Sequence, residues 1–131
     1  MESTIETETG EIIAKLVPIN IETERGRITI LHMELFKALE PSDLKYVSQA
    51  INDLKPFIKG DIVVLSARAP IWYYVYTAHI FHGIVRAVAV FDPKLRGAVV
   101  VMSHTRTYEE GEVIKLPEEI LIQLTETKTP Q

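Results

Sequence analysis

Two histidines near the middle of the chain are spaced so that they could bind a metal ion or take part in acid–base catalysis. His79 and His82 are three residues apart near the end of an expected helix, so they share one face of it. Two imidazoles at this spacing could hold a metal ion, and either could act as an acid or a base near neutral pH. The alternative is that both are ordinary residues of a helix end, packed or solvated.

Further polar residues follow two expected strands. Asp92 ends one strand, with Lys94 and Arg96 close behind it. Its carboxylate could bind a hard cation or orient a base, or it could only hydrogen-bond its own backbone in the turn. His104 follows the next strand, whereas His32 is interpreted as a core or surface residue. Three histidines and one aspartate, without cysteine, suit Mn²⁺ or Mg²⁺ better than structural zinc.

The segment Ser66–Pro70 joins an apolar strand to the start of a helix. Free backbone N–H groups and the helix dipole favour an anion at such a place, and the Arg68 guanidinium could add further donors. The chain has neither a Walker lysine nor a G-x-G-x-x-G motif. The alternative to an anion site is a plain strand–helix connection.

The elements that must position these residues alternate along the chain. We expect a β-hairpin over 11–35, helices over 40–54 and 71–82, and strands over 62–66, 85–91 and 98–103. The segment 113–124 forms either late strands or a strand and a short helix. The order β-β-α-β-α-β-β predicts an α/β fold with a mixed sheet, in which a right-handed crossover makes strands 62–66 and 85–91 parallel.

Length and composition limit the classes of protein. The 131 residues allow one domain, expected over 11–125 between a flexible N-terminus (1–10) and a loose tail (126–131). The absence of cysteine excludes disulfide scaffolds and thiol catalysis. The net charge is −4, yet residues 60–108 carry five basic and two acidic residues, which could attract a small anion but not duplex DNA. No signal peptide or membrane-spanning run is visible, so a soluble, cytoplasmic protein is expected.

Geometry separates the polar residues into two groups. If strands 85–91 and 98–103 form a hairpin, Asp92 and His104 lie roughly 20 Å apart, at opposite ends of it. His79 and His82 lie roughly 15–20 Å from Arg68, at the far end of their helix. One protomer therefore has an anion-binding end and a histidine end, and a site shared between subunits could combine them.

Between residues 60 and 115 several blocks resemble, in order and spacing, one family of small CRISPR-associated proteins, the Csx-three or ring nuclease three family. The blocks are Ser66–Trp72, Ala78–His79, Ala89–Lys94, Gly97–His104 and Glu110–Ile114. The resemblance implies a homodimer with a Rossmann-like core, distantly similar to the CRISPR-associated domain that senses cyclic oligoadenylates. It also implies Mn²⁺-dependent cleavage of cyclic tetra-adenylate to linear di-adenylate, which switches off type III CRISPR defence, by dimers that stack into tetramers or filaments around the ligand.

The resemblance assigns roles to residues by position. Together with the donor types above, it implies catalysis by His79, Asp92 and His104, metal binding by His79, His82 and Asp92, and ligand binding by Ser66, Ala67, Arg68, Ala69, Lys94 and Arg96.

Two alternatives to a ring nuclease stay open. Ala67 and Ala69 stand where the family carries glycine, which favours a module that binds and sequesters cyclic oligoadenylate without cutting it. The third hypothesis is an Mn²⁺-dependent deadenylase that acts on the 3′ end of short RNA.

Overall fold

A seven-stranded mixed sheet forms the centre of the computed structural model, which describes residues 1–126. The strands are β1 (Ser3–Glu6), β2 (Ile12–Thr23), β3 (Gly26–Leu35), β4 (Ile62–Ala67), β5 (Ala87–Asp92), β6 (Gly97–Ser103) and β7 (Val113–Lys115). The helices are α1 (Leu44–Leu54), α2 (Ile71–Phe81) and α3 (Glu118–Thr125), with 3-10 turns at Pro41–Asp43 and Lys55–Phe57.

The strands lie in the sheet in the order in which they occur in the sequence. β3, β4 and β5 are mutually parallel, whereas the remaining neighbours are antiparallel. The expected β2–β3 hairpin, the parallel pair β4–β5 and the β5–β6 hairpin are all confirmed. β4 is buried along its first five residues, as its continuous apolar run predicts for a central parallel strand.

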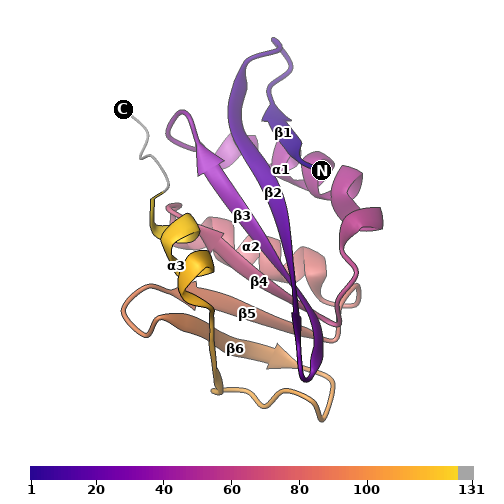
Figure 1. The fold of residues 1–131 in the computed structure, drawn as a ribbon. Coiled ribbons are helices and arrows are strands. Elements are labelled where there is room, and N and C mark those ends of the chain that lie inside the picture. Colours follow the sequence, from indigo (N-terminus) through magenta and orange to yellow (C-terminus); the bar gives the residue numbers. More distant parts are fainter. Residues whose placement is uncertain (127–131) are drawn as a thin grey trace.

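The expected Rossmann-like core is not confirmed, because the strand order runs from β1 to β7 without a reversal. The two crossovers through α1 and α2 advance across the sheet in the same direction, so both helices pack on the same face. α3 covers the opposite face (Figure 1). The sheet therefore has no point of strand-order reversal to open a ligand crevice, and any cavity must come from how helices cover its edge.

Each face of the sheet has its own apolar core. On the first face, Ile51 of α1 and Tyr73 and Phe81 of α2 pack on β3, β4 and β5. On the second, Leu121 and Leu124 of α3 pack against the alternate residues of the same strands. This alternation along each strand sends successive side chains to opposite faces.

One element of the structure, β1, was not expected from the sequence. The segment 113–124, for which the alternatives stayed open, is a strand followed by a helix, with Pro117 preceding the first helical residue. The flexible N-terminus expected over 1–10 is wrong for Ser3–Glu6, which pair with β2. Four residues give too short a pattern to reveal a strand, yet Ile5 is fully buried. Of the expected loose tail, 127–131 lie outside the described residues.

Both predicted helix boundaries have local causes. Pro41 at the first helical position begins a 3-10 turn, and the Asp43 carboxylate accepts a hydrogen bond (2.8 Å) from the Glu40 N–H ahead of it. α2 ends before Gly83, which has a φ of 93° that a side chain would oppose. Over residues 1–126, none of the helices has the length and apolar character needed to cross a bilayer.

If β1 is part of the folded sheet, removing its buried side chain must destabilise the protein. We expect Ile5→Ala to lower the free energy of unfolding by about 2–5 kcal/mol, because it leaves a cavity against α1 and β2. Urea denaturation followed by circular dichroism measures the change. Thr4→Ala, at the exposed neighbour, is the matched control and should cost little. Equal effects of the two variants would contradict the docking of β1.

Candidate functional site

A cavity of about 320 Å³ lies where the parallel strands end, between the carboxyl edge of the sheet and the end of α3. We call it the α3 cavity. It is lined by His32, Ser66, Ala67, Arg68, Tyr74, Phe91, Pro93, Leu124 and Thr125. Because ligands of parallel α/β sheets bind beyond the carboxyl ends of the strands, this is the candidate ligand-binding site.

Two buried polar side chains lie side by side in the lining of the α3 cavity. His32 and Ser66 are neighbours in the parallel β3–β4 register, and His32 Nδ1 lies 2.8 Å from Ser66 Oγ. His32 is only 3% exposed, and this burial lowers its pKa below 6.5. The imidazole is therefore neutral at pH 7. His32 is a candidate that sequence reasoning missed, because only the register shows that it neighbours Ser66.

Arg68 lies at the mouth of the α3 cavity. Its side chain is exposed, and Nη2 donates a hydrogen bond of 3.0 Å to the Thr125 carbonyl at the end of α3. A cation is stabilised there because the last carbonyls of a helix carry partial negative charge. The predicted anion-binding arginine is thus at the cavity, but it is already engaged by a neutral acceptor.

One tyrosine holds the backbone of the Ser66–Pro70 segment, whose first two residues are the end of β4. The Tyr74 hydroxyl accepts from the Ala67 N–H (3.0 Å) and donates to the Ala67 carbonyl. Neither Ala67 nor Ala69 has a positive φ, since Arg96 is the one non-glycine residue of the described chain that does. The loop therefore keeps its shape without glycine. Ala67 lines the α3 cavity, whereas Ala69 does not.

The other residues predicted for the anion-binding end serve the turn beside the cavity. Asp92 Oδ1 accepts hydrogen bonds from the backbone N–H groups of Lys94 (2.9 Å) and Leu95 (3.3 Å). Arg96 pairs with the Glu118 carboxylate in the first turn of α3. The Asp92 bonds fix the β5–β6 turn itself, and the Arg96–Glu118 pair holds this turn against α3. Neither Asp92 nor Arg96 lines the cavity.

The histidines meet at the opposite end of β5. The rings of His82 and His104 pack edge to face, with centroids 5.1 Å apart. The His104 N–H donates to the Arg86 carbonyl (2.7 Å), which fixes the start of its loop beside β5. Since Asp92 pairs with Gly97 at the other end of the β5–β6 ladder, the expected separation between Asp92 and the histidine end is confirmed.

Within residues 1–126, no three His, Cys, Asp or Glu side chains lie close enough together to hold a metal ion. The metal set expected from His79, His82 and Asp92 is therefore not assembled in one chain. His82 and His104 bring two imidazoles together, and His79 lies one helical turn before His82. The described chain thus brings imidazoles together at this end of β5 without completing a metal site.

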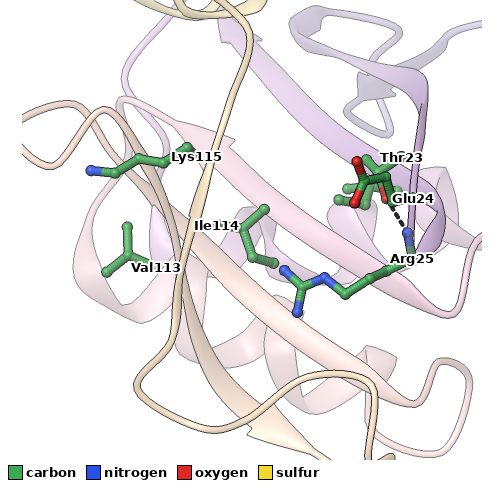
Figure 2. Close-up of a pocket in the computed structure, with 7 residues that line it drawn as sticks. Thr23, Glu24, Arg25, Val113, Ile114 and Lys115 are labelled. Carbon is green, nitrogen blue, oxygen red and sulfur yellow. Dashed lines mark hydrogen bonds between the residues drawn. The ribbon is translucent and has the colours of Figure 1, made fainter.

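A second cavity, of about 300 Å³, lies between the β2–β3 hairpin turn and β7. Figure 2 shows the Arg25 guanidinium reaching from the turn toward Ile114. Arg25 stacks 4.6 Å from the Tyr108 ring centre and forms an ion pair (2.5 Å) with Glu112, which lowers the pKa of that carboxyl. Its charge is already matched, so it serves to fix the hairpin turn to the loop before β7.

The fold and the site together define a class of protein. It is an α/β protein with a partly apolar cavity at the carboxyl ends of its parallel strands and a cation at the cavity mouth.

A family model described as "CRISPR-associated protein (Cas_csx3)" matches residues 32–115, well over half of the chain. The chain therefore belongs to the Cas_csx3 family of CRISPR-associated proteins. An uncharacterized protein of Aquifex aeolicus (strain VF5) is 36% identical over 115 residues, which cover 88% of this chain and 97% of that protein. No solved structure matches.

The burial of His32 predicts how stability depends on pH. Because its pKa is lower in the folded state, the unfolded chain takes up this proton first as the pH falls. The contribution of His32 is complete above about pH 6.5 and is lost progressively below it. We expect the free energy of unfolding to fall between about pH 7 and about pH 5, and His32→Gln to flatten this slope.

Urea denaturation at several pH values measures the slope. Thr29→Val is the control, because it changes a buried residue of the same strand that does not titrate. A slope in His32→Gln equal to that of the wild type would contradict the assignment. Should His32→Gln not fold, direct titration of the His32 ring by NMR must give a midpoint below 6.5.

Proposed function

We propose that this protein is a cytoplasmic ring nuclease that binds cyclic tetra-adenylate and cleaves it to linear di-adenylate, ending the signal of type III CRISPR defence. The observation that carries the proposal is the family match over residues 32–115. That range contains Arg68 at the cavity mouth and the histidines at the other end of β5. The region that defines the family is thus also the region that bears both polar groups.

The anion-binding end suits a phosphate of the ligand. Arg68 lies at the edge of the α3 cavity, and Lys94 follows Asp92 in the neighbouring turn. A guanidinium can form paired hydrogen bonds with a phosphate, which the Thr125 carbonyl cannot match in strength. Displacement of that carbonyl by a phosphate is therefore favourable. In this proposal Ser66, Ala67, Arg68 and Ala69 form the binding loop, while Lys94 and Arg96 add positive charge beside it.

The histidine end suits cleavage of an RNA linkage. Each 3′–5′ linkage carries its own nucleophile in the neighbouring 2′-hydroxyl, so the protein has to orient that group and take its proton. His82 and His104 are adjacent exposed imidazoles, and His79 lies on the same helix one turn away. We assign the acid and base roles to His79 and His104. Asp92 lies at the opposite end of β5, so its orienting role would require a second copy of the chain.

A manganese ion is part of the proposal, with the histidine end as its site. His82 would supply one ligand and further ligands would come from a second copy of the chain, because an imidazole bound to the metal cannot also take the proton. Bound there, Mn²⁺ would act as a Lewis acid toward the phosphate.

Two copies of the chain would bring the separated ends together. α2 exposes Ile71 (82%) and Val75 (65%), which are four residues apart and therefore on one face with His79. A helix with apolar residues all round is normally covered on every side. A homodimer through this face would cover Ile71 and Val75 and place His79 at the partner. Stacked dimers could then clasp the symmetric ring.

Loss of the paired histidines should stop cleavage and spare binding. We expect His104→Ala to slow the conversion of cyclic tetra-adenylate by about 10²–10⁴-fold, because an acid–base group is removed. His79→Ala should also slow it, and a chelator should abolish it. Product is followed by chromatography over time, and binding by gel shift. Val101→Ala, an exposed neighbour on β6, is the control.

The same assay decides between the ring nuclease and its alternatives. Binding of the ring without product in the presence of Mn²⁺ would contradict the proposal and support a sequestering module. Shortening of linear poly-adenylate that stops when its 3′ end is blocked, with the ring left intact, would support a deadenylase.

The exposed face of α2 gives a separate prediction about assembly. We expect Val75→Glu to convert a dimer to a monomer, because a buried carboxylate without a partner is costly at an apolar interface. Light scattering after size exclusion measures the mass. Gln49→Glu introduces the same charge on the exposed side of α1 and should leave the dimer intact. A monomeric wild type, or a dimeric Val75→Glu variant, would contradict the α2 interface.

A further inference from the structure

We propose that the α3 cavity is a pocket for a single adenine nucleotide unit, with the base inside, its phosphate at Arg68, and Ser66 as the residue that distinguishes adenine from a 6-oxo purine. The choice of adenine rests on the proposed function. The location and the size of the pocket do not, since they follow from the cavity itself.

The volume of the cavity limits what it can hold. At about 320 Å³ it lies near the lower end of ligand pockets, which run from roughly 300 to 1,000 Å³. A base with its sugar or phosphate fits such a space, whereas a ring of four nucleotides does not. One unit of a larger ligand would therefore enter the α3 cavity while the rest stays outside.

The walls suit a planar, uncharged ring. Phe91 and Tyr74 are aromatic, and Leu124 of α3 adds an aliphatic surface. Aromatic side chains favour stacked or edge-on contact with other rings. Among the described lining residues, Arg68 alone carries a permanent charge, and it lies at the mouth. An apolar interior with one cation at its entrance matches a base attached to a phosphate.

The buried polar pair provides the recognition of the base. His32 is neutral at pH 7, and its Nδ1 lies 2.8 Å from Ser66 Oγ. We assign the tautomer in which Nδ1 is the acceptor, so that the Ser66 hydroxyl donates its hydrogen to His32 and keeps its own lone pairs. The oxygen then accepts a hydrogen bond from a ligand amino group but repels a carbonyl oxygen. Adenine presents an amino group at its 6-position, and hypoxanthine presents a carbonyl.

The pocket depends on a helix outside the region that the family model matches. That match ends at residue 115, whereas α3 spans Glu118–Thr125 and supplies the wall through Leu124 and Thr125. Burial of Ile120 and Leu121 anchors the helix on the sheet. Because the strand order has no reversal to open a crevice, α3 itself makes the enclosure. Entry of a phosphate would replace the Thr125 carbonyl as the partner of Arg68.

Titration of the full chain with mononucleotides tests the pocket. We expect adenosine monophosphate to shift the backbone amide NMR signals of Ser66, Arg68 and Thr125, and to bind about fivefold to tenfold more tightly than inosine monophosphate. Ribose 5-phosphate should bind more weakly still. Equal binding of the two nucleotides would overturn the role of Ser66. Equal binding of ribose 5-phosphate, or shifts elsewhere only, would overturn the base pocket.

Two variants with matched controls separate the contributions. Ser66→Ala should remove the preference for the adenine nucleotide, while Thr29→Val, which removes a buried hydroxyl elsewhere on the sheet, should retain it. Arg68→Gln should weaken nucleotide binding by about tenfold to a hundredfold. Arg27→Gln, which removes an exposed arginine of a surface ion pair, should not. Loss of the preference in both Ser66→Ala and Thr29→Val would contradict the role of Ser66, and loss of binding in both arginine variants would contradict the role of Arg68.

The nucleotide titration and the ring nuclease assay test the two proposals independently. A mononucleotide has no ring to cleave, so its binding does not depend on the histidine end. Cleavage of the ring by a protein that does not bind adenosine monophosphate would overturn the pocket alone. Tight nucleotide binding without ring cleavage would support the pocket and contradict the proposed function.

Discussion

The parallel pairing of β3, β4 and β5 is the constraint on which the candidate site depends. It brings three carboxyl ends to one edge of the sheet and sets His32 beside Ser66 in adjacent strands. In a strand order without a reversal, this edge has no built-in crevice. α3 provides the enclosure instead, held by its apolar face on the sheet, by the Arg96–Glu118 pair at one end and by the Arg68–Thr125 contact at the other. One helix thus sets both the depth and the closure of the cavity.

A chain of this size keeps its anion-binding and histidine groups apart because β5 lies between them. In the proposed function, phosphate recognition at one end and proton transfer at the other could therefore not act on the same linkage within one copy. Ile71 and Val75 form an exposed apolar surface on α2. Through this surface a second copy of the chain could place its own polar groups beside those of the first. Such sharing would couple activity to assembly, since a monomer would keep the α3 cavity and lose the combined site.

Sequence reasoning found the elements whose pattern is strong. The apolar runs of β4, β5 and β6 and the spacing in α1 are long enough to show their type, and the crossover rule then gave the parallel pair. Sequence reasoning missed β1, because four residues are too few to show the alternation of buried and exposed side chains that marks a strand. Ile5 of this strand is nevertheless fully buried. Among the predicted site residues, Ser66 and Arg68 line the α3 cavity, while their role in ligand binding stays a prediction. Asp92 was interpreted as a candidate catalytic group, yet its carboxylate is hydrogen-bonded to two backbone N–H groups of its own turn.

The sequence by itself determined the class of fold, the family, the strand–helix loop at Ser66–Pro70 and the division of polar residues between two ends, because each follows from local pattern and chain order. Only the tertiary structure decided which side chains meet. The His32–Ser66 pair depends on the register between strands 34 residues apart, and the His82–His104 contact on how α2 ends beside the β6 loop. The cavity depends on how α3 packs on the sheet, because the end of this helix forms one of its walls. These are contacts between distant segments, and they form only when packing fixes the segments relative to one another.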